Sequence, residues 1–229
     1  MSKLPRVAVL GATGAVGQEF IRLFEERDFQ FASLKLLASA RSAGKKIMVK
    51  GKEYTVEEAK PESFENIDIA LFAGGSISKT LAPEAAKRGA VVIDNSSTFR
   101  MDPEVPLVIP EINPEDIAWH KGIIANPNCS TIISMVALSG VARLTPIDTL
   151  VACTYQAVSC AGQGGIEELE GQLQAYAQGA PLEHKAFPCQ ILSNVIPQIG
   201  SRLDNGYTTE EMKMQNEGRK ILHLPELKV

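Results

Sequence analysis

The chain has 229 residues, of which 45% are hydrophobic and 22% charged, and its formal net charge is −4 at pH 7. This is ordinary globular composition, with room for one large or two modest domains. The acidic balance argues against the basic surface of a protein that binds nucleic acid or an anionic membrane, and no apolar run is long enough to cross a bilayer.

The N-terminal part of the chain alternates between strand and helix patterns. The apolar runs at 5–10 and 31–39 predict buried strands, and residues 15–27 between them have the apolar spacing of a helix. Such a unit normally forms a parallel strand pair with a right-handed crossover. Residues 45–58 then predict a hairpin with its turn at 50–52.

The alternation continues to about residue 127. Strands are expected at 67–75, 90–97 and 122–126, with a helix over 78–89. Alternating strands and helices are typical of an open α/β sheet, so residues 1–127 are predicted to form one domain of Rossmann-like architecture.

After residue 127 the pattern changes, and residues 128–229 are predicted to form a second, catalytic domain. An apolar helix is expected at 130–144 and a long alternating strand at 149–159. Residues 178–206 are loop-rich, and an amphipathic helix is expected at 208–222.

A glycine-rich stretch, GATGAVG at 11–17, lies between the first strand and the first helix. Glycines at this place allow a tight turn and let a phosphate approach the helix N-terminus, where N–H groups and the dipole favour anions. The spacing GxxGxxG is a variant of the dinucleotide fingerprint, although an ordinary tight turn also has this form.

The second strand ends in SARSAGK (39–45), without the acidic residue that holds the ribose 2′-hydroxyl in NAD enzymes. Ser39, Arg41 and Ser42 offer a charge and hydroxyl groups suited to a 2′-phosphate. We therefore expect NADP as the cofactor, with a solvated surface arginine as the alternative interpretation.

Cys129 stands at the start of a predicted helix, in NPNCST. The N–H groups and dipole of a helix N-terminus favour the thiolate, which is the nucleophilic form of cysteine. Cys153, Cys160 and Cys189 lack this setting. An inert, buried cysteine is the alternative, but the helix start favours a nucleophile at Cys129.

Three charged residues form a group that an anionic ligand would explain. Arg100 follows a strand end, where α/β sheets bind ligands. Glu210 and Lys213 lie three apart and share one face of the last helix, a spacing that a surface ion pair explains better. No cluster of residues has metal-ligand spacing, and no metal is expected.

Together these motifs resemble those of the aspartate-semialdehyde dehydrogenase family. They occur in the family's order: GATGAVG, SARSAGK, FAGGS, NSSTFRM, IPEIN, NPNCSTI, TYQAVS, NVIPQIG and TEEMKMQNE. The resemblance implies a cytoplasmic, NADP-dependent oxidoreductase of lysine, threonine and methionine biosynthesis. Its reaction interconverts L-aspartyl-4-phosphate with L-aspartate 4-semialdehyde and phosphate.

The resemblance also implies a role for each matching residue. Cys129 forms the thioester, and Gln156 orients the intermediate. Arg100 and Lys213 hold the phosphate, and Glu210 pairs with the substrate's ammonium group. The residues that it implies for NADP binding are Gly11, Thr13, Gly14, Ala15, Val16, Ser39, Arg41, Ser42, Ser159 and Cys160. Cys160 takes the place of a glycine that is usual in the family.

Family members continue beyond HLPELKV, at the end of this chain. The resemblance therefore implies a C-terminally truncated chain with an incomplete α+β substrate and dimerisation domain. Such a chain lacks the family's acid/base histidine, and we expect little activity from it alone. For the full-length protein a homodimer or homotetramer is implied. The alternatives are an N-acetyl-gamma-glutamyl-phosphate reductase and a catalytically silent NADP-binding relative.

Overall fold

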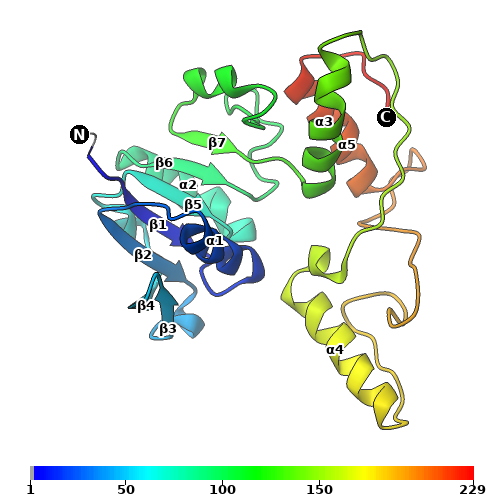
Figure 1. Ribbon diagram of the computed structural model, residues 1–229, viewed down its shortest axis with the longest axis horizontal. Coiled ribbons are helices and arrows are strands. Elements are labelled where there is room, and N and C mark those ends of the chain that lie inside the picture. Colours follow the sequence, from blue (N-terminus) through cyan, green and yellow to red (C-terminus); the bar gives the residue numbers. More distant parts are fainter. Residues whose placement is uncertain (1–2) are drawn as a thin grey trace. The chain divides into compact units, whose positions relative to one another are not determined.

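The computed structural model describes residues 3–229 (Figure 1). These residues divide into two compact units. The first contains the described residues up to Val151 together with Lys213–Val229, and the second is Ala152–Met212. Within residues 3–229, no helix has the length and apolar character needed to cross a membrane.

The first unit is built on a seven-stranded sheet with the order β3-β4-β2-β1-β5-β6-β7. Six strands run in one direction, and they are β1 (Arg6–Leu10), β2 (Ser33–Ala38), β4 (Lys52–Glu58), β5 (Ile69–Phe72), β6 (Val91–Asp94) and β7 (Ile123–Ala125). The edge strand β3 (Lys46–Val49) is antiparallel to β4. The predicted α/β fold with a parallel sheet is confirmed.

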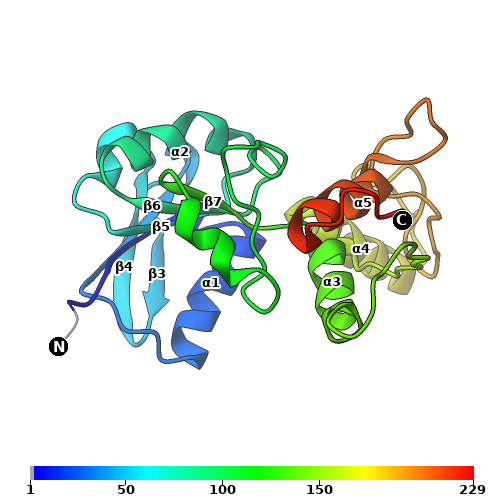
Figure 2. The same ribbon diagram turned by 90° about the horizontal axis from the view of Figure 1, so that it is seen from above.

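Helices α1 (Ala15–Glu26) and α2 (Ser78–Lys87) cover opposite faces of this sheet (Figure 2). Side chains alternate between the two faces along each strand. Val9 of β1 belongs to the cluster of buried side chains under α1, and its neighbour Leu10 to the cluster under α2. Burial on both faces explains why these strands read as continuous apolar runs.

The predicted hairpin is confirmed, with Val49 of β3 paired to Lys52 of β4. The two residues between them, Lys50 and Gly51, have φ values of 50° and 75°. Positive φ at both central positions is the geometry of the two-residue turn that matches strand twist.

A third core cluster joins helices α3 (Cys129–Ala142) and α5 (Thr209–Leu222), both near their predicted positions. Met135 of α3 packs with Met214 and Ile221 of α5 in this cluster. Short 3₁₀ helices complete the described structure at η1 (Ala40–Ser42), η2 (Pro61–Phe64), η3 (Gly75–Ile77), η4 (Pro114–Trp119) and η5 (Val158–Ala161).

The second unit contains α4 (Gln163–Ala177), which the sequence pattern did not predict. The buried side chain of Gln172 holds the following loop to this helix. Its amide donates to the carbonyl oxygen of Glu183 at 2.8 Å, and its oxygen accepts from the N–H groups of Ile191 and Leu192. The loop-rich character predicted for 178–206 is confirmed, with one isolated bridge from Arg202 to Thr208.

The strand predicted at 149–159 is wrong. Thr149 makes an isolated bridge to Lys228, and beyond it the segment pairs with no strand among residues 3–229. Val151 and Tyr155 are 89% and 90% exposed. An alternating sequence is compatible with a β-strand, but a strand forms when its backbone N–H and C=O groups are hydrogen-bonded to a neighbouring backbone.

Candidate functional site

The predicted cofactor and nucleophile motifs of the first unit follow the carboxyl ends of parallel strands, which meet at one edge of the sheet. Gly11 follows β1, Ser39 follows β2, and Asn126 follows β7. Ligands of α/β sheets bind at this edge. Since β7 is three strands from β1, the two ends are about 14 Å apart at ordinary strand spacing. An extended ligand such as a dinucleotide suits that span.

The glycine turn after β1 has two positions that exclude any side chain. Gly11 has φ of 82°, and a Cβ there would lie 2.5 Å from the carbonyl oxygen of Ala73. A Cβ at Gly17 would lie 2.1 Å from the oxygen of Gly11. The N-cap of α1 is Gly14, which is exposed and has no side chain. The N–H groups in the first turn of this helix are therefore not capped by the residue before it. This arrangement can hold an anionic group.

The end of β2 carries a short 3₁₀ turn rather than a carboxylate. Ser39 and Arg41 are exposed there, whereas Ser42 is buried and donates its N–H to the oxygen of Ser39 at 2.9 Å. Arg41 is therefore accessible to a ligand lying over the glycine turn, and Ser42 shapes the segment that carries it.

Cys129 is the first residue of α3, and its side chain is exposed while its neighbours Asn128 and Ser130 are buried. The Asn128 side-chain oxygen accepts from the N–H groups of Ser130 and Thr131 at 3.0 and 3.3 Å. This N-cap fixes the first turn of the helix. The thiol thus stands at a capped, accessible helix N-terminus, a setting that in general favours a thiolate.

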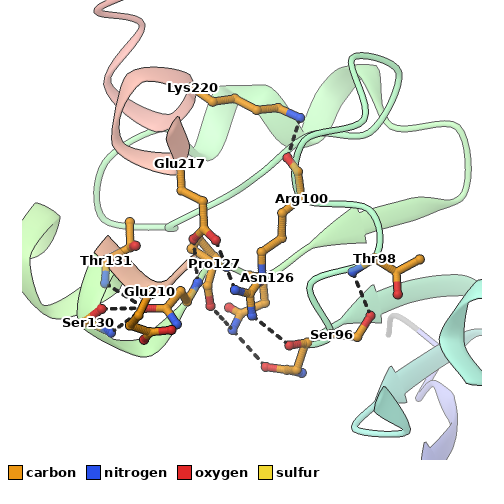
Figure 3. A network of polar contacts seen from close by, with 12 residues as sticks. Ser96, Thr98, Arg100, Asn126, Pro127, Ser130, Thr131, Glu210, Glu217 and Lys220 are labelled. Atoms are coloured by element: carbon orange, nitrogen blue, oxygen red, sulfur yellow. Dashed lines mark hydrogen bonds and ion pairs between the residues drawn. The ribbon is translucent and has the colours of Figure 1, made fainter. Parts of the chain in front are cut away.

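A buried polar network ties Arg100 to this helix start (Figure 3). The Arg100 guanidinium donates to the carbonyl oxygens of Asn126 at 3.0 Å and Asn95 at 2.9 Å. It also pairs with Glu217 Oε1 at 3.0 Å, and Glu217 Oε2 accepts from the N–H of Asn128 at 2.7 Å. The structure therefore brings Arg100 together with the residue before Cys129.

Glu217 is the residue of this site that the sequence pattern missed, although it is the last residue of TEEMKMQNE. A signal was present in its spacing. Met214, Gly218 and Ile221 form the buried stripe of α5, and Glu217 lies on that stripe. An acidic residue on the apolar face of a helix indicates a buried, paired charge.

The remaining predicted residues fall in two places. Lys213 belongs to the first unit and is half-buried on α5. In the second unit, the Gln156 amide donates to Glu210 Oε1 at 3.5 Å and to Cys160 Sγ at 3.6 Å. Gln156, Glu210 and Cys160 therefore lie together, with Ser159 next to Cys160 in η5.

Two family models match the chain. Residues 6–120 match the model described as semialdehyde dehydrogenase, NAD binding domain, and residues 138–229 match the model described as semialdehyde dehydrogenase, dimerisation domain.

Similar proteins carry one name. Aspartate-semialdehyde dehydrogenase of Bacillus subtilis is 53% identical to this chain, and the match covers 97% of the chain and 67% of that protein. The same enzyme of Aquifex aeolicus is 53% identical, with 98% and 67% covered. The chain thus spans about two thirds of the length of these relatives. They give no support to the reductase alternative.

Solved structures agree with this likeness. Aspartate semialdehyde dehydrogenase II of Vibrio cholerae, complexed with ASA, superposes with a TM-score of 0.96 at 47% identity and covers all of this chain and 69% of its own. The enzyme of Candida albicans with NADP has a TM-score of 0.60 at 32% identity, covering 69% of this chain and 52% of its own.

Proposed function

This chain belongs to the semialdehyde dehydrogenase family, and we propose that at the length of its relatives it carries out the reaction of an aspartate-semialdehyde dehydrogenase. The reaction interconverts L-aspartyl-4-phosphate with L-aspartate 4-semialdehyde and phosphate, using NADP. The observation that carries the proposal is the exposed Cys129 at the start of α3, on the same sheet edge as the glycine turn.

The residues at the carboxyl edge suit NADP. The first turn of α1, with Gly11, Thr13, Gly14, Ala15 and Val16, would hold the pyrophosphate through N–H groups.

Arg41, with Ser39 and Ser42, would hold the 2′-phosphate, since no carboxylate stands at the end of β2 to repel it. Ser159 and Cys160 would line the nicotinamide side. Bound NADPH supplies the hydride that brings the acyl group to the aldehyde level.

The nucleophile and its neighbours account for the other half of the chemistry. The Cys129 thiolate attacks the acyl carbon, the bond to phosphate breaks, and a thioester to Cys129 remains. Arg100 and Lys213 would stabilise charge on the departing phosphate. Gln156 would orient the acyl group, and Glu210 would pair with the substrate's ammonium group.

The domain organisation we propose keeps the boundary that the sequence pattern predicts. Residues 1–127 form the NADP-binding domain and residues 128–229 belong to the catalytic domain. The match to a dimerisation domain supports a homodimer or homotetramer. We also propose a cytoplasmic location, which the family resemblance of the motifs implies.

The test is NADP reduction with aspartate semialdehyde and phosphate. We expect turnover by a version extended to the length of the relatives, little by the 229-residue chain, and none by the extended Cys129→Ala variant. Extended Cys153→Ala, which removes another exposed cysteine, should keep its activity. Robust turnover by extended Cys129→Ala would contradict the mechanism.

A further inference from the structure

Glu217 is a buried carboxylate with two partners from distant parts of the sequence. Its side chain is 2% exposed, and its two oxygens accept from Arg100 Nη1 and from the N–H of Asn128, at 3.0 and 2.7 Å. A buried charge is costly unless it is paired and hydrogen-bonded. These two contacts therefore explain why an acidic residue can occupy the buried face of α5.

The Arg100 guanidinium is fixed by acceptors on three different segments. Besides Glu217, it donates from Nε to the oxygen of Asn126 and from Nη2 to the oxygen of Asn95, just after β7 and β6. These bonds use three of its five N–H donors, and the other two are the ones that would meet an anionic ligand, on a side chain that is 9% exposed. Glu217 is the charged partner among the three, and it also reaches the start of the Cys129 helix.

A second residue of α5 holds the same segment in a different way. Lys220 Nζ donates to the carbonyl oxygens of Arg100, Asp102 and Val105 at 2.8, 2.7 and 2.8 Å. Lys220 therefore fixes the backbone of this segment, whereas Glu217 fixes the guanidinium (Figure 3). The difference provides a matched control one turn further along the same helix.

We propose that Glu217 is a positioning residue that links the anion-binding Arg100 to the first turn of the nucleophile helix. It sets the guanidinium and the thiol of Cys129 at a fixed spacing, so that the leaving phosphate and the attacked carbon are held together. The anion-binding role of Arg100 rests on the proposed function, whereas the link between Arg100 and Asn128 does not.

The test is the alkylation of Cys129 by iodoacetamide in the 229-residue chain, followed by mass spectrometry of the Cys129 peptide with increasing inorganic phosphate. In Glu217→Gln the carboxamide presents an N–H group to one of the two donors, which loses its acceptor. We expect the phosphate concentration for half-protection to rise about tenfold or more. In Lys220→Met it should stay within about twofold of the wild-type value, although both variants melt at a lower temperature.

A separate readout needs no ligand. Without phosphate, alkylation at pH 7 should be at least about threefold faster in Glu217→Gln. The reason is that the carboxylate bonded to the N–H of Asn128, the residue before Cys129, no longer opposes the negative charge of the thiolate. Lys220→Met should match the wild type. If phosphate protects the wild type and Glu217→Gln equally, or if the two variants behave alike in both assays, the positioning role is wrong. If phosphate fails to protect the wild type while the alkylation rates differ as expected, the link stands and the phosphate role of Arg100 is wrong.

Discussion

Gly11 is one of the two glycines in the turn after β1 that leave no room for a side chain. Gly11 combines a φ of 82° with an approach to the Ala73 carbonyl that leaves no room for a Cβ. Gly44 has a similar φ of 85° but open space around it. A comparison of Gly11 with Gly44 therefore separates the cost of the positive φ from the cost of the steric clash, because φ is similar at the two positions.

We expect Gly11→Ala to lower the free energy of unfolding by about 3 kcal/mol or more, because strain and a clash with main-chain atoms add together. Gly44→Ala should cost about 1 kcal/mol, from strain alone. Urea unfolding measures both values. Equal losses in the two variants would contradict the role assigned to the close contact with Ala73.

Individual residues also show how far the sequence could predict the site. The helix start at Cys129 and the tight turn at Gly11 were predictable because both depend on neighbours within a few positions. The spacing of α5 places Glu217 on the buried face of that helix, but its partners Asn128 and Arg100 were not predictable, since they are 89 and 117 residues away in the sequence. The fold brings those segments together, and no local pattern records it.

Among the elements, the starts of β1 and β5 are joined by an ion pair. Arg6 donates three hydrogen bonds to the Asp68 carboxylate, two from its guanidinium and one from its backbone N–H. These bonds hold the pKa of Asp68 well below its ordinary value of 3.8. A carboxyl whose pKa is lower in the folded state stabilises the fold above its unfolded pKa, and this stabilisation is lost as pH falls through the folded pKa.

Accordingly, Asp68→Asn should lower the melting temperature at pH 7, and the gap to the wild type should narrow at pH 3. Thermal unfolding followed by circular dichroism at the two pH values measures it. Asn in place of the exposed Asp204 is the matched control, and it should show no such narrowing. A gap that stays constant or widens at pH 3 would contradict the assigned pairing.

Helices and strands were predictable where they have a periodic apolar face or form a continuous apolar run. Helices α1, α2 and α5 have such a face, whereas α3 and the central strands are continuous apolar runs. The segment 149–159 alternates equally well, yet forms no strand because no described backbone pairs with it beyond the bridge at Thr149. Pairing is a non-local property, and periodicity cannot supply it.

The two units of the whole molecule differ in how their residues are buried. The three core clusters are formed by buried residues of the first unit. In the described residues of the second unit, Ala152–Met212, the buried positions are Gly165 and Gln172. Because the second unit buries little apolar surface, its own packing contributes little free energy against local unfolding.

Rates of amide hydrogen exchange should therefore differ between the first unit and the second unit, Ala152–Met212. Amides of β1, β5 and β6 should exchange slowest, and those of α4 at least about 100-fold faster, because α4 can open without exposing a core. Exchange followed by mass spectrometry measures this in the wild-type chain, with α1 as the matched helix on the sheet. Protection of α4 equal to that of α1 would contradict the difference in burial.

The large sequence separation between Glu217 and its partners has a consequence for folding during synthesis. All seven strands of the sheet come from residues up to Ala125, so a growing chain on the ribosome can pair them before α5 exists. The hydrogen bonds of Arg100 and Asn128 to Glu217 form after residue 217 has been synthesised. The Cys129 thiol would be synthesised early and acquire its fixed surroundings late, so the nascent chain passes through a period in which Cys129 exists but Glu217 does not yet hold the start of its helix.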